Sequence, residues 1–107
     1  MKDRQTYNLR VYGIAINSRN EVLITDEYQL NTKMTKFPGG GMEKGEGTID
    51  CLQREFFEEM NQPITNIRHF YTTDFYQPGW FYPEMQVVSI YYLVDLVEPV
   101  QFKTSNK

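Results

Sequence analysis

The sequence predicts one mixed α/β domain in which a single helix interrupts a series of strands. Two strand-like stretches precede a glycine-rich loop, an amphipathic helix follows that loop, and two more strand-like stretches come after the helix. A chain of 107 residues is long enough to bury one hydrophobic core. Its 40% hydrophobic and 23% charged residues are typical of a globular protein rather than a disordered one.

The segment before the glycine loop predicts a hairpin and then a loop. Residues 9–17 carry apolar side chains on both alternating faces, which predicts a strand covered on two sides. Residues 18–20 have turn composition, and residues 21–25 predict a short returning strand. Residues 28–35 are polar and irregular, so we expect a loop there.

One helix is predicted from Gly47 or Thr48 to about Met60. Thr48 can cap its start, Asn61 tolerates a left-handed terminal conformation, and Pro63 prevents continuation. On a helical wheel four apolar residues form one stripe: Ile49, Leu52, Phe56 and Met60. Acidic side chains lie beside this stripe, which suits a site at the mouth of a cleft.

The last part of the chain predicts a second hairpin. Residues 65–77 and 84–97 are strand-like, and Pro78-Gly79 is a strong turn signal between them. The uninterrupted apolar alternation of residues 88–96 is typical of a central strand. Of the aromatic residues that crowd this region, Trp80 and Tyr82 at the turn are candidates for stacking on a base. Core packing is the alternative explanation for these aromatic side chains.

Charge and cysteine content exclude several classes. A net charge of −3 argues against a general nucleic-acid or anionic-membrane surface. The single cysteine, Cys51, cannot form an intrachain disulfide, so we expect a reducing, cytoplasmic compartment. Neither a signal-peptide pattern nor an apolar run of about eighteen residues is present. A small molecule is the expected partner, with neither nucleic acid nor membrane.

The helix carries a cluster of carboxylates that favours a metal ion. Glu58 and Glu59 lie three and four residues after Glu55, so all three side chains share one side of the helix. Such like-charge pairs destabilise a bare helix by about 0.2–0.5 kcal/mol each. Mg²⁺ or Mn²⁺ would remove the repulsion, because these ions prefer oxygen ligands. Arg54 can pair with Glu58 or orient Glu55, and a solvated acidic face is the alternative reading.

With its spacing, the loop and helix read Gly40-x5-Glu46-x7-Arg54-Glu55-Phe56-x-Glu58-Glu59. This pattern resembles the Nudix box, the signature of hydrolases that act on nucleoside diphosphates linked to another moiety. The chain departs from the box at Asn61 and Gln62, where the family has glycine and an aliphatic residue. The resemblance implies an αβα sandwich with a mixed sheet.

A typical Nudix domain continues beyond the last long strand into a further strand and a second helix. Here the chain stops ten residues after Val97, so we expect a single Nudix-type domain over residues 1–107 that lacks the C-terminal helix. Either the chain is truncated, or a partner chain, such as a second copy in a homodimer, covers the open face.

The resemblance implies metal and catalytic roles for the box residues. Glu58 and Glu59 would bind the metal together with the backbone carbonyl of Gly40 or, alternatively, of Gly39. Glu55 would be a further ligand or the general base.

Other residues would support that centre. Arg54 would hold the catalytic carboxylates in place, and Glu46 and Gly41 would support the loop. Substrate contacts are expected from three residues outside the helix: Lys36, Trp80 and Tyr82. The implied reaction is metal-dependent hydrolysis of a pyrophosphate bond in an ADP-ribose-like, dinucleotide or nucleoside triphosphate substrate. The alternative is a catalytically silent Nudix-like module that binds a nucleotide or a protein.

Overall fold

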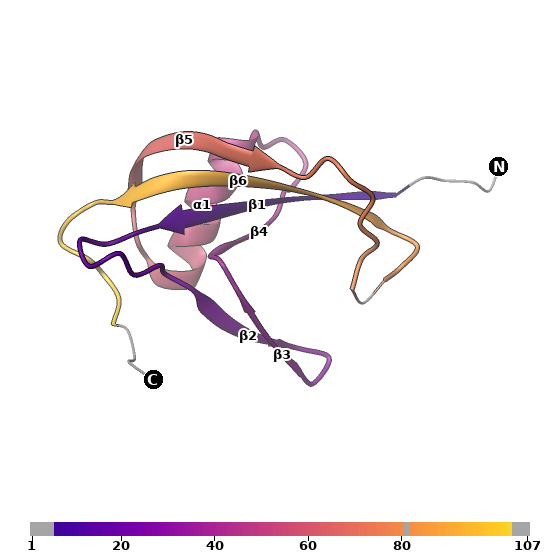
Figure 1. Cartoon of the computed structure of the whole chain (residues 1–107), viewed down its shortest axis with the longest axis horizontal. Coiled ribbons are helices and arrows are strands. Elements are labelled where there is room, and N and C mark those ends of the chain that lie inside the picture. Colours follow the sequence, from indigo (N-terminus) through magenta and orange to yellow (C-terminus); the bar gives the residue numbers. More distant parts are fainter. Residues whose placement is uncertain (1–5, 81, 104–107) are drawn as a thin grey trace.

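The computed structural model describes residues 6–80 and 82–103 and contains a mixed four-stranded sheet (Figure 1). The strands lie in the order β4–β1–β6–β5, with these bounds: β4 Gly39–Gly41, β1 Tyr7–Ala15, β6 Gln86–Leu96 and β5 Ile64–Thr72. β1 and β6 run parallel, whereas β4 and β5 pair antiparallel to their neighbours. The predicted mixed α/β class is therefore confirmed, and so is the central position of β6.

A separate two-stranded hairpin projects from the sheet (Figure 1). It consists of β2 (Thr25–Gln29) and β3 (Thr32–Lys36), and both turn residues, Leu30 and Asn31, have positive φ angles of 52° and 62°. The predicted loop at 28–35 is therefore wrong. Polar residues occupy this hairpin because it stands away from the core, so the apolar alternation that marks a half-buried strand is missing.

The predicted strand at 21–25 is also largely wrong. Of this segment only Val22 forms a bridge, to Ile16, and the Leu23 amide donates to the Ala15 carbonyl at 3.0 Å. The chain turns at residues 18–20 as expected, and a hydrogen-bonded ladder then resumes at Thr25 with β3 as its partner instead of β1.

The helix α1 (Thr48–Met60) has the predicted bounds, but its start differs from the expected cap. Gly47 is the N-cap residue, and its amide donates to the Asp50 carboxylate at 3.0 Å. The Thr48 hydroxyl instead forms a 2.6 Å hydrogen bond with the Tyr92 hydroxyl on β6. At the other end Asn61 adopts the predicted left-handed conformation, with φ 53° and ψ 38°.

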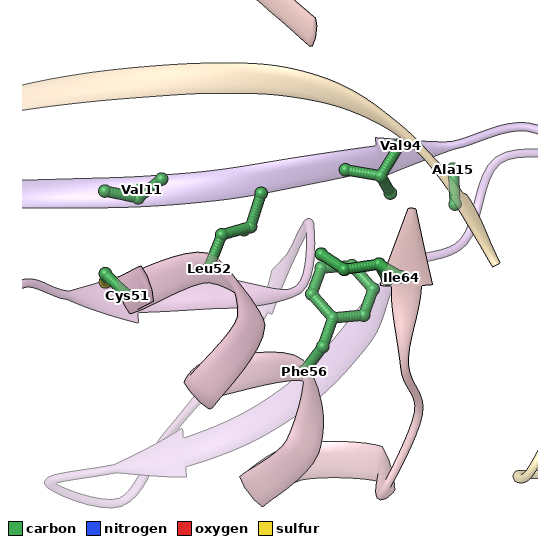
Figure 2. Close-up of a cluster of buried hydrophobic side chains, with 7 residues drawn as sticks. All are labelled: Val11, Ala15, Cys51, Leu52, Phe56, Ile64 and Val94. Atoms are coloured by element: carbon green, nitrogen blue, oxygen red, sulfur yellow. The ribbon is translucent and has the colours of Figure 1, made fainter. Parts of the chain in front are cut away.

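The core lies between α1 and one face of the sheet (Figure 1). Figure 2 shows its buried side chains pointing into this layer: Val11, Ala15, Cys51, Leu52, Phe56, Ile64 and Val94. Gly13 lets the helix approach the sheet, because a Cβ there would lie 2.6 Å from the Phe56 ring. Of the predicted apolar stripe, Leu52 and Phe56 are fully buried, whereas Ile49 is 43% exposed and does not belong to the core.

Gln62, the departure from the Nudix pattern, is fully buried. Its amide nitrogen donates to the carbonyls of Pro63 (2.8 Å) and Val97 (3.0 Å), and its side-chain oxygen accepts from the Gln101 amide (2.7 Å). The side chain therefore connects the end of α1 to the segment that follows β6. An aliphatic residue could fill the volume but could not form these hydrogen bonds.

Within residues 6–80 and 82–103, α1 is the single helix, and it is neither long nor apolar enough to cross a membrane.

The predicted late strands are shorter than expected, because the ladder of β5 ends at Thr72 and that of β6 begins at Gln86. An isolated bridge joins Pro78 to Gln86, so the turn signal at Pro78-Gly79 lies inside a longer connection.

Candidate active site

Arg54 connects the glycine loop to the carboxylates of the helix. Its Nε and Nη2 both donate to Glu46, the Nη2 bond being 2.9 Å long. Nη1 donates to Glu55 at 3.1 Å and to Glu58 at 3.3 Å, while Nη2 also reaches the Gly41 carbonyl at 3.1 Å. The structure thus brings together the predicted catalytic residues and the predicted loop supports around one guanidinium.

Glu46 is held as a carboxylate by these contacts. Hydrogen bonds from Arg54, and a further one from the Glu43 amide at 2.9 Å, lower the pKa of Glu46 from 4.5 to about 2. An ionised Glu46 at neutral pH keeps the loop attached to the helix. Glu46 and Gly41 both contact Arg54, and the supporting role that the Nudix resemblance implies for them stays a prediction.

The three glycines of β4 allow the loop backbone to pass close to other groups. A Cβ on Gly39, whose φ is 148°, would lie 2.0 Å from the Val11 carbonyl oxygen. A Cβ on Gly40 would lie 2.5–2.8 Å from the carboxylate atoms of Glu55. Gly40 therefore makes the space in which the Glu55 carboxylate lies, whereas a Cβ on Gly41 would meet nothing closer than 3.5 Å.

Glu59 lies on the other side of this cluster, where Lys36 is its cationic partner. The Lys36 ammonium lies 3.5 Å from the Glu59 carboxylate and donates to the Gly39 carbonyl at 3.1 Å. Two of the predicted metal-binding groups therefore already surround one positive charge. Carboxylate and carbonyl oxygens are the donors that Mg²⁺ and Mn²⁺ prefer, so the donor set fits such an ion.

The three helix carboxylates differ in exposure. The side chain of Glu55 is 15% exposed, that of Glu59 is 24% exposed, and that of Glu58 is 58% exposed. Burial, together with the neighbouring charge of Glu55, raises the pKa of Glu59, while Lys36 opposes that shift. Burial is therefore the main cause of this raised pKa, and the nearby Glu55 carboxylate adds to it.

In the part of the chain that the structure describes, no three His, Cys, Asp or Glu side chains converge closely enough to hold a metal ion. The carboxylates have different cation partners: Glu55 and Glu58 pair with Arg54, whereas Glu59 pairs with Lys36 and also lies close to Glu55. The donors are adjacent on one helix face, and rotation of their side chains would bring them together.

A cleft of about 650 Å³ adjoins the carboxylates, and Lys36 lines it. Tyr12 and Tyr91 stack on its floor with ring centroids 5.5 Å apart, and Phe37 meets Tyr91 edge-on at 6.1 Å. All three predicted substrate residues lie on this cleft: Lys36, Trp80 and Tyr82. The cleft and the carboxylate cluster therefore share Lys36 as their common boundary.

Sequence reasoning missed Arg10, Tyr12 and Tyr91 as cleft residues. Arg10 Nε donates to the Tyr12 hydroxyl at 2.6 Å, and its guanidinium carbon lies 5.7 Å from the centre of the Tyr12 ring. The available signal was alternation: Tyr12 and Tyr91 lie on the strand faces opposite to the core residues Val11 and Val94. Which strands would be neighbours was not visible in that pattern.

Comparison with known proteins agrees with this geometry. A family model for the NUDIX domain matches residues 6–106. A NUDIX hydrolase from Nitrosomonas europaea superposes with a TM-score of 0.74 at 15% identity, covering 94% of this chain and 68% of that one. A MutT structure from a study of Aliivibrio salmonicida and Vibrio cholerae gives a TM-score of 0.65 at 28% identity, with coverages of 83% and 65%.

A third similar structure is the Escherichia coli ORF135 protein, with a TM-score of 0.74 at 16% identity and coverages of 96% and 71%. An ADP compounds hydrolase matches with a TM-score of 0.68 at 15% identity, and the chain spans 54% of its length. No curated protein sequence matches the chain. The family match spans nearly the whole sequence, and these structures have the same fold, so the chain belongs to the Nudix hydrolase family.

Proposed function

We propose that this chain hydrolyses a pyrophosphate bond in a nucleoside diphosphate linked to another moiety, with Mg²⁺ or Mn²⁺ as its cofactor. One observation carries the proposal. The cluster of Glu55, Glu58 and Glu59 is organised by Arg54 and borders an aromatic cleft through Lys36. A phosphate-handling centre beside stacking surfaces suits a nucleotide better than it suits an inorganic polyphosphate.

The cleft supports a substrate that carries a ring. The stacked Tyr12 and Tyr91 offer a flat apolar surface, and base stacking on aromatic side chains contributes about 1–3 kcal/mol per base. Arg10 and Lys36 add positive charge along the same wall, where phosphate groups would lie. A structural neighbour named as an ADP compounds hydrolase supports the nucleotide assignment.

In the mechanism we assign, Glu58, Glu59 and the Gly39 carbonyl would hold the divalent ion. The contact between Lys36 and the Gly39 carbonyl favours Gly39 over Gly40 as the backbone donor. The ion, when bound, neutralises phosphate oxygens and lowers the pKa of water. Glu55, oriented by Arg54, accepts the proton of the water that attacks phosphorus while the bond to the bridging oxygen breaks.

A silent binding module is the second candidate. The observation that favours it is that Arg54 and Lys36 already form ion pairs with all three carboxylates. Such a protein would bind a nucleotide in the cleft without cleaving it. The two candidates differ in turnover and in their response to carboxylate substitutions.

A phosphatase-coupled assay distinguishes them. Alkaline phosphatase releases phosphate from phosphomonoester products but not from an intact diphosphate-linked substrate, so a panel of ADP-sugars and dinucleotides can be screened with Mg²⁺ or Mn²⁺. We expect turnover by the wild type and a loss of about a hundredfold or more in Glu58→Gln. Glu84→Gln, a change on an exposed turn, is the matched control. Equal and near-zero phosphate release by all three proteins would favour the silent module.

Two further expectations belong to this proposal. We propose a cytoplasmic location, which the single, buried thiol of Cys51 supports. We also propose that a second copy of the chain can associate with it. Light scattering coupled to size exclusion will report the mass, and a monomer at high micromolar concentration would contradict the dimer.

A further inference from the structure

Lys36 occupies an unusual position for a lysine. Its side chain is only 15% exposed, although ammonium groups are strongly hydrated and lysine is rarely buried without partners. Its ammonium contacts the Gly39 carbonyl at 3.1 Å, Glu27 at 3.3 Å and Glu59 at 3.5 Å. It also lies 5.9 Å from the centre of the Tyr12 ring.

Two of these contacts coincide with the proposed metal ligands. The Gly39 carbonyl and the Glu59 carboxylate are the groups from β4 and α1 that would hold a divalent ion. Both are strong oxygen acceptors, and one ammonium cannot share them with a doubly charged ion at bonding distance without strong repulsion. Binding of a divalent ion at these oxygens therefore competes with the contacts that Lys36 makes to them.

We propose that Lys36 is a built-in counter-cation that holds the Gly39 and Glu59 oxygens in place without metal and is displaced when the divalent ion binds. This inference rests on the proposed metal-dependent function, and it adds a competitor that sets the metal affinity. Because Lys36 ends β3, its occupancy of the site also couples the β2–β3 hairpin to the helix. Lys36 is thus a positioning residue for the metal site.

The structure provides a place for the displaced ammonium. Glu27 lies on the paired strand of the same hairpin, and Tyr12 lies on the cleft floor. Neither group is a proposed metal ligand, so both contacts can survive when those to Gly39 and Glu59 are lost. The lysine would then face the cleft, where the phosphates of a nucleotide would approach.

Acylation of the wild-type protein tests the displacement directly. Brief treatment with an N-hydroxysuccinimide ester, followed by peptide mass spectrometry, reports the reactivity of each lysine with and without Mn²⁺. We expect Mn²⁺ to raise the labelling of Lys36 several-fold, while exposed Lys33 and Lys44 keep their rates. Unchanged or reduced labelling of Lys36 at saturating Mn²⁺ would overturn the proposal.

Metal affinity provides the second test, by electron paramagnetic resonance of free Mn²⁺. We expect Lys36→Met to bind Mn²⁺ about tenfold more tightly than the wild type, because one like charge within a few ångströms is removed. Lys36→Arg, which keeps the charge, should retain the weaker wild-type affinity. Lys33→Met is the control, since Lys33 pairs with Asp26 on the exposed part of the hairpin.

The outcomes separate this inference from the proposed function. Equal or weaker Mn²⁺ binding by Lys36→Met, with normal binding by the wild type, would overturn the competition and leave the metal site intact. Absence of binding by both proteins would overturn the metal site and the competition together. Binding by Lys36→Met alone would be the strongest form of the expected result.

Discussion

Arg54 holds Glu46 through two nitrogen atoms, and this pair spans the eight residues that separate the loop from the middle of the helix. A bidentate guanidinium–carboxylate pair restricts both distance and orientation, which a lysine could not do. The remaining nitrogen of the same guanidinium reaches Glu55 and Glu58. The guanidinium of Arg54 therefore links the carboxylates of Glu55 and Glu58 to Glu46 in the loop.

Glu46→Gln should lower the free energy of unfolding, by an amount that depends on pH. The pKa of Glu46 is about 2 in the folded protein against an ordinary 4.5, so its stabilisation is complete above pH 4.5. That stabilisation is lost as the pH falls from about 4.5 to about 2. We expect the variant to have a lower free energy of unfolding than the wild type at pH 7, with the difference shrinking over this acidic range. Urea unfolding at pH 7, 4.5 and 3 measures it.

Glu84→Gln is the control for that experiment, because Glu84 is exposed on a turn. The free energy of unfolding of Glu84→Gln should differ little from that of the wild type at all three pH values. A Glu46→Gln deficit that stayed constant from pH 7 to pH 3 would show that the charge of Glu46 is not the source of the stability.

Gly40→Ala should damage the site while leaving the fold largely intact. The new Cβ would lie 2.5–2.8 Å from the Glu55 carboxylate, so that side chain must move. We expect about a tenfold loss of Mn²⁺ affinity or of hydrolysis, because a small misplacement of a catalytic group is costly. Gly41→Ala is the neighbouring control, since its Cβ would meet only ordinary contacts at 3.5 Å. Equal losses in the two variants would argue against a steric role for Gly40.

The adjacent residues Phe56 and Phe57 should respond very differently to truncation. Phe56 is fully buried against Gly13 and Leu52, whereas Phe57 is 59% exposed. We expect Phe56→Ala to lower the free energy of unfolding by about 3–5 kcal/mol and Phe57→Ala by about 1 kcal/mol or less. Thermal and urea denaturation measure both. Similar losses would mean that α1 packs through a different face.

Gln62→Leu should destabilise the protein although leucine is apolar and of similar size. It would leave the Pro63 and Val97 carbonyls and the Gln101 amide without their side-chain partner. We expect a loss of about 2 kcal/mol, because unsatisfied buried polar groups cost about 1–3 kcal/mol. Gln53→Leu, on an exposed turn of α1, should change stability by about 0.5 kcal/mol or less. A stabilised Gln62→Leu would show that the family's aliphatic residue is the better choice here.

Local sequence patterns were sufficient to predict the helices and strands whose apolar residues recur at a regular spacing. The helix from Thr48 to Met60, its left-handed end at Asn61 and the central strand β6 all follow from apolar spacing and terminal residues. The β2–β3 hairpin was not predictable in the same way. Among the described residues, the core cluster includes none from these two strands, and Leu30 is not a residue that normally signals a turn with positive φ.

The candidate site likewise combines contacts that helical spacing predicts with contacts that depend on the tertiary structure. The grouping of Glu55, Glu58 and Glu59 follows from helical geometry, and the pairing of Arg54 with Glu58 follows from a four-residue spacing. The contact between Lys36 and Glu59 spans 23 residues and depends on how β3 passes the helix. No local period contains that information.

The sequence by itself determined the fold class, the helix and the side of it that carries the carboxylates, because these depend on repeats of two and 3.6 residues along one chain. Only the tertiary structure decided which cation each carboxylate meets and which aromatic side chains form the cleft. The stacked Tyr12 and Tyr91 come from strands almost eighty residues apart, brought together by the parallel pairing of β1 and β6. Such contacts arise from strand order, which periodicity does not encode.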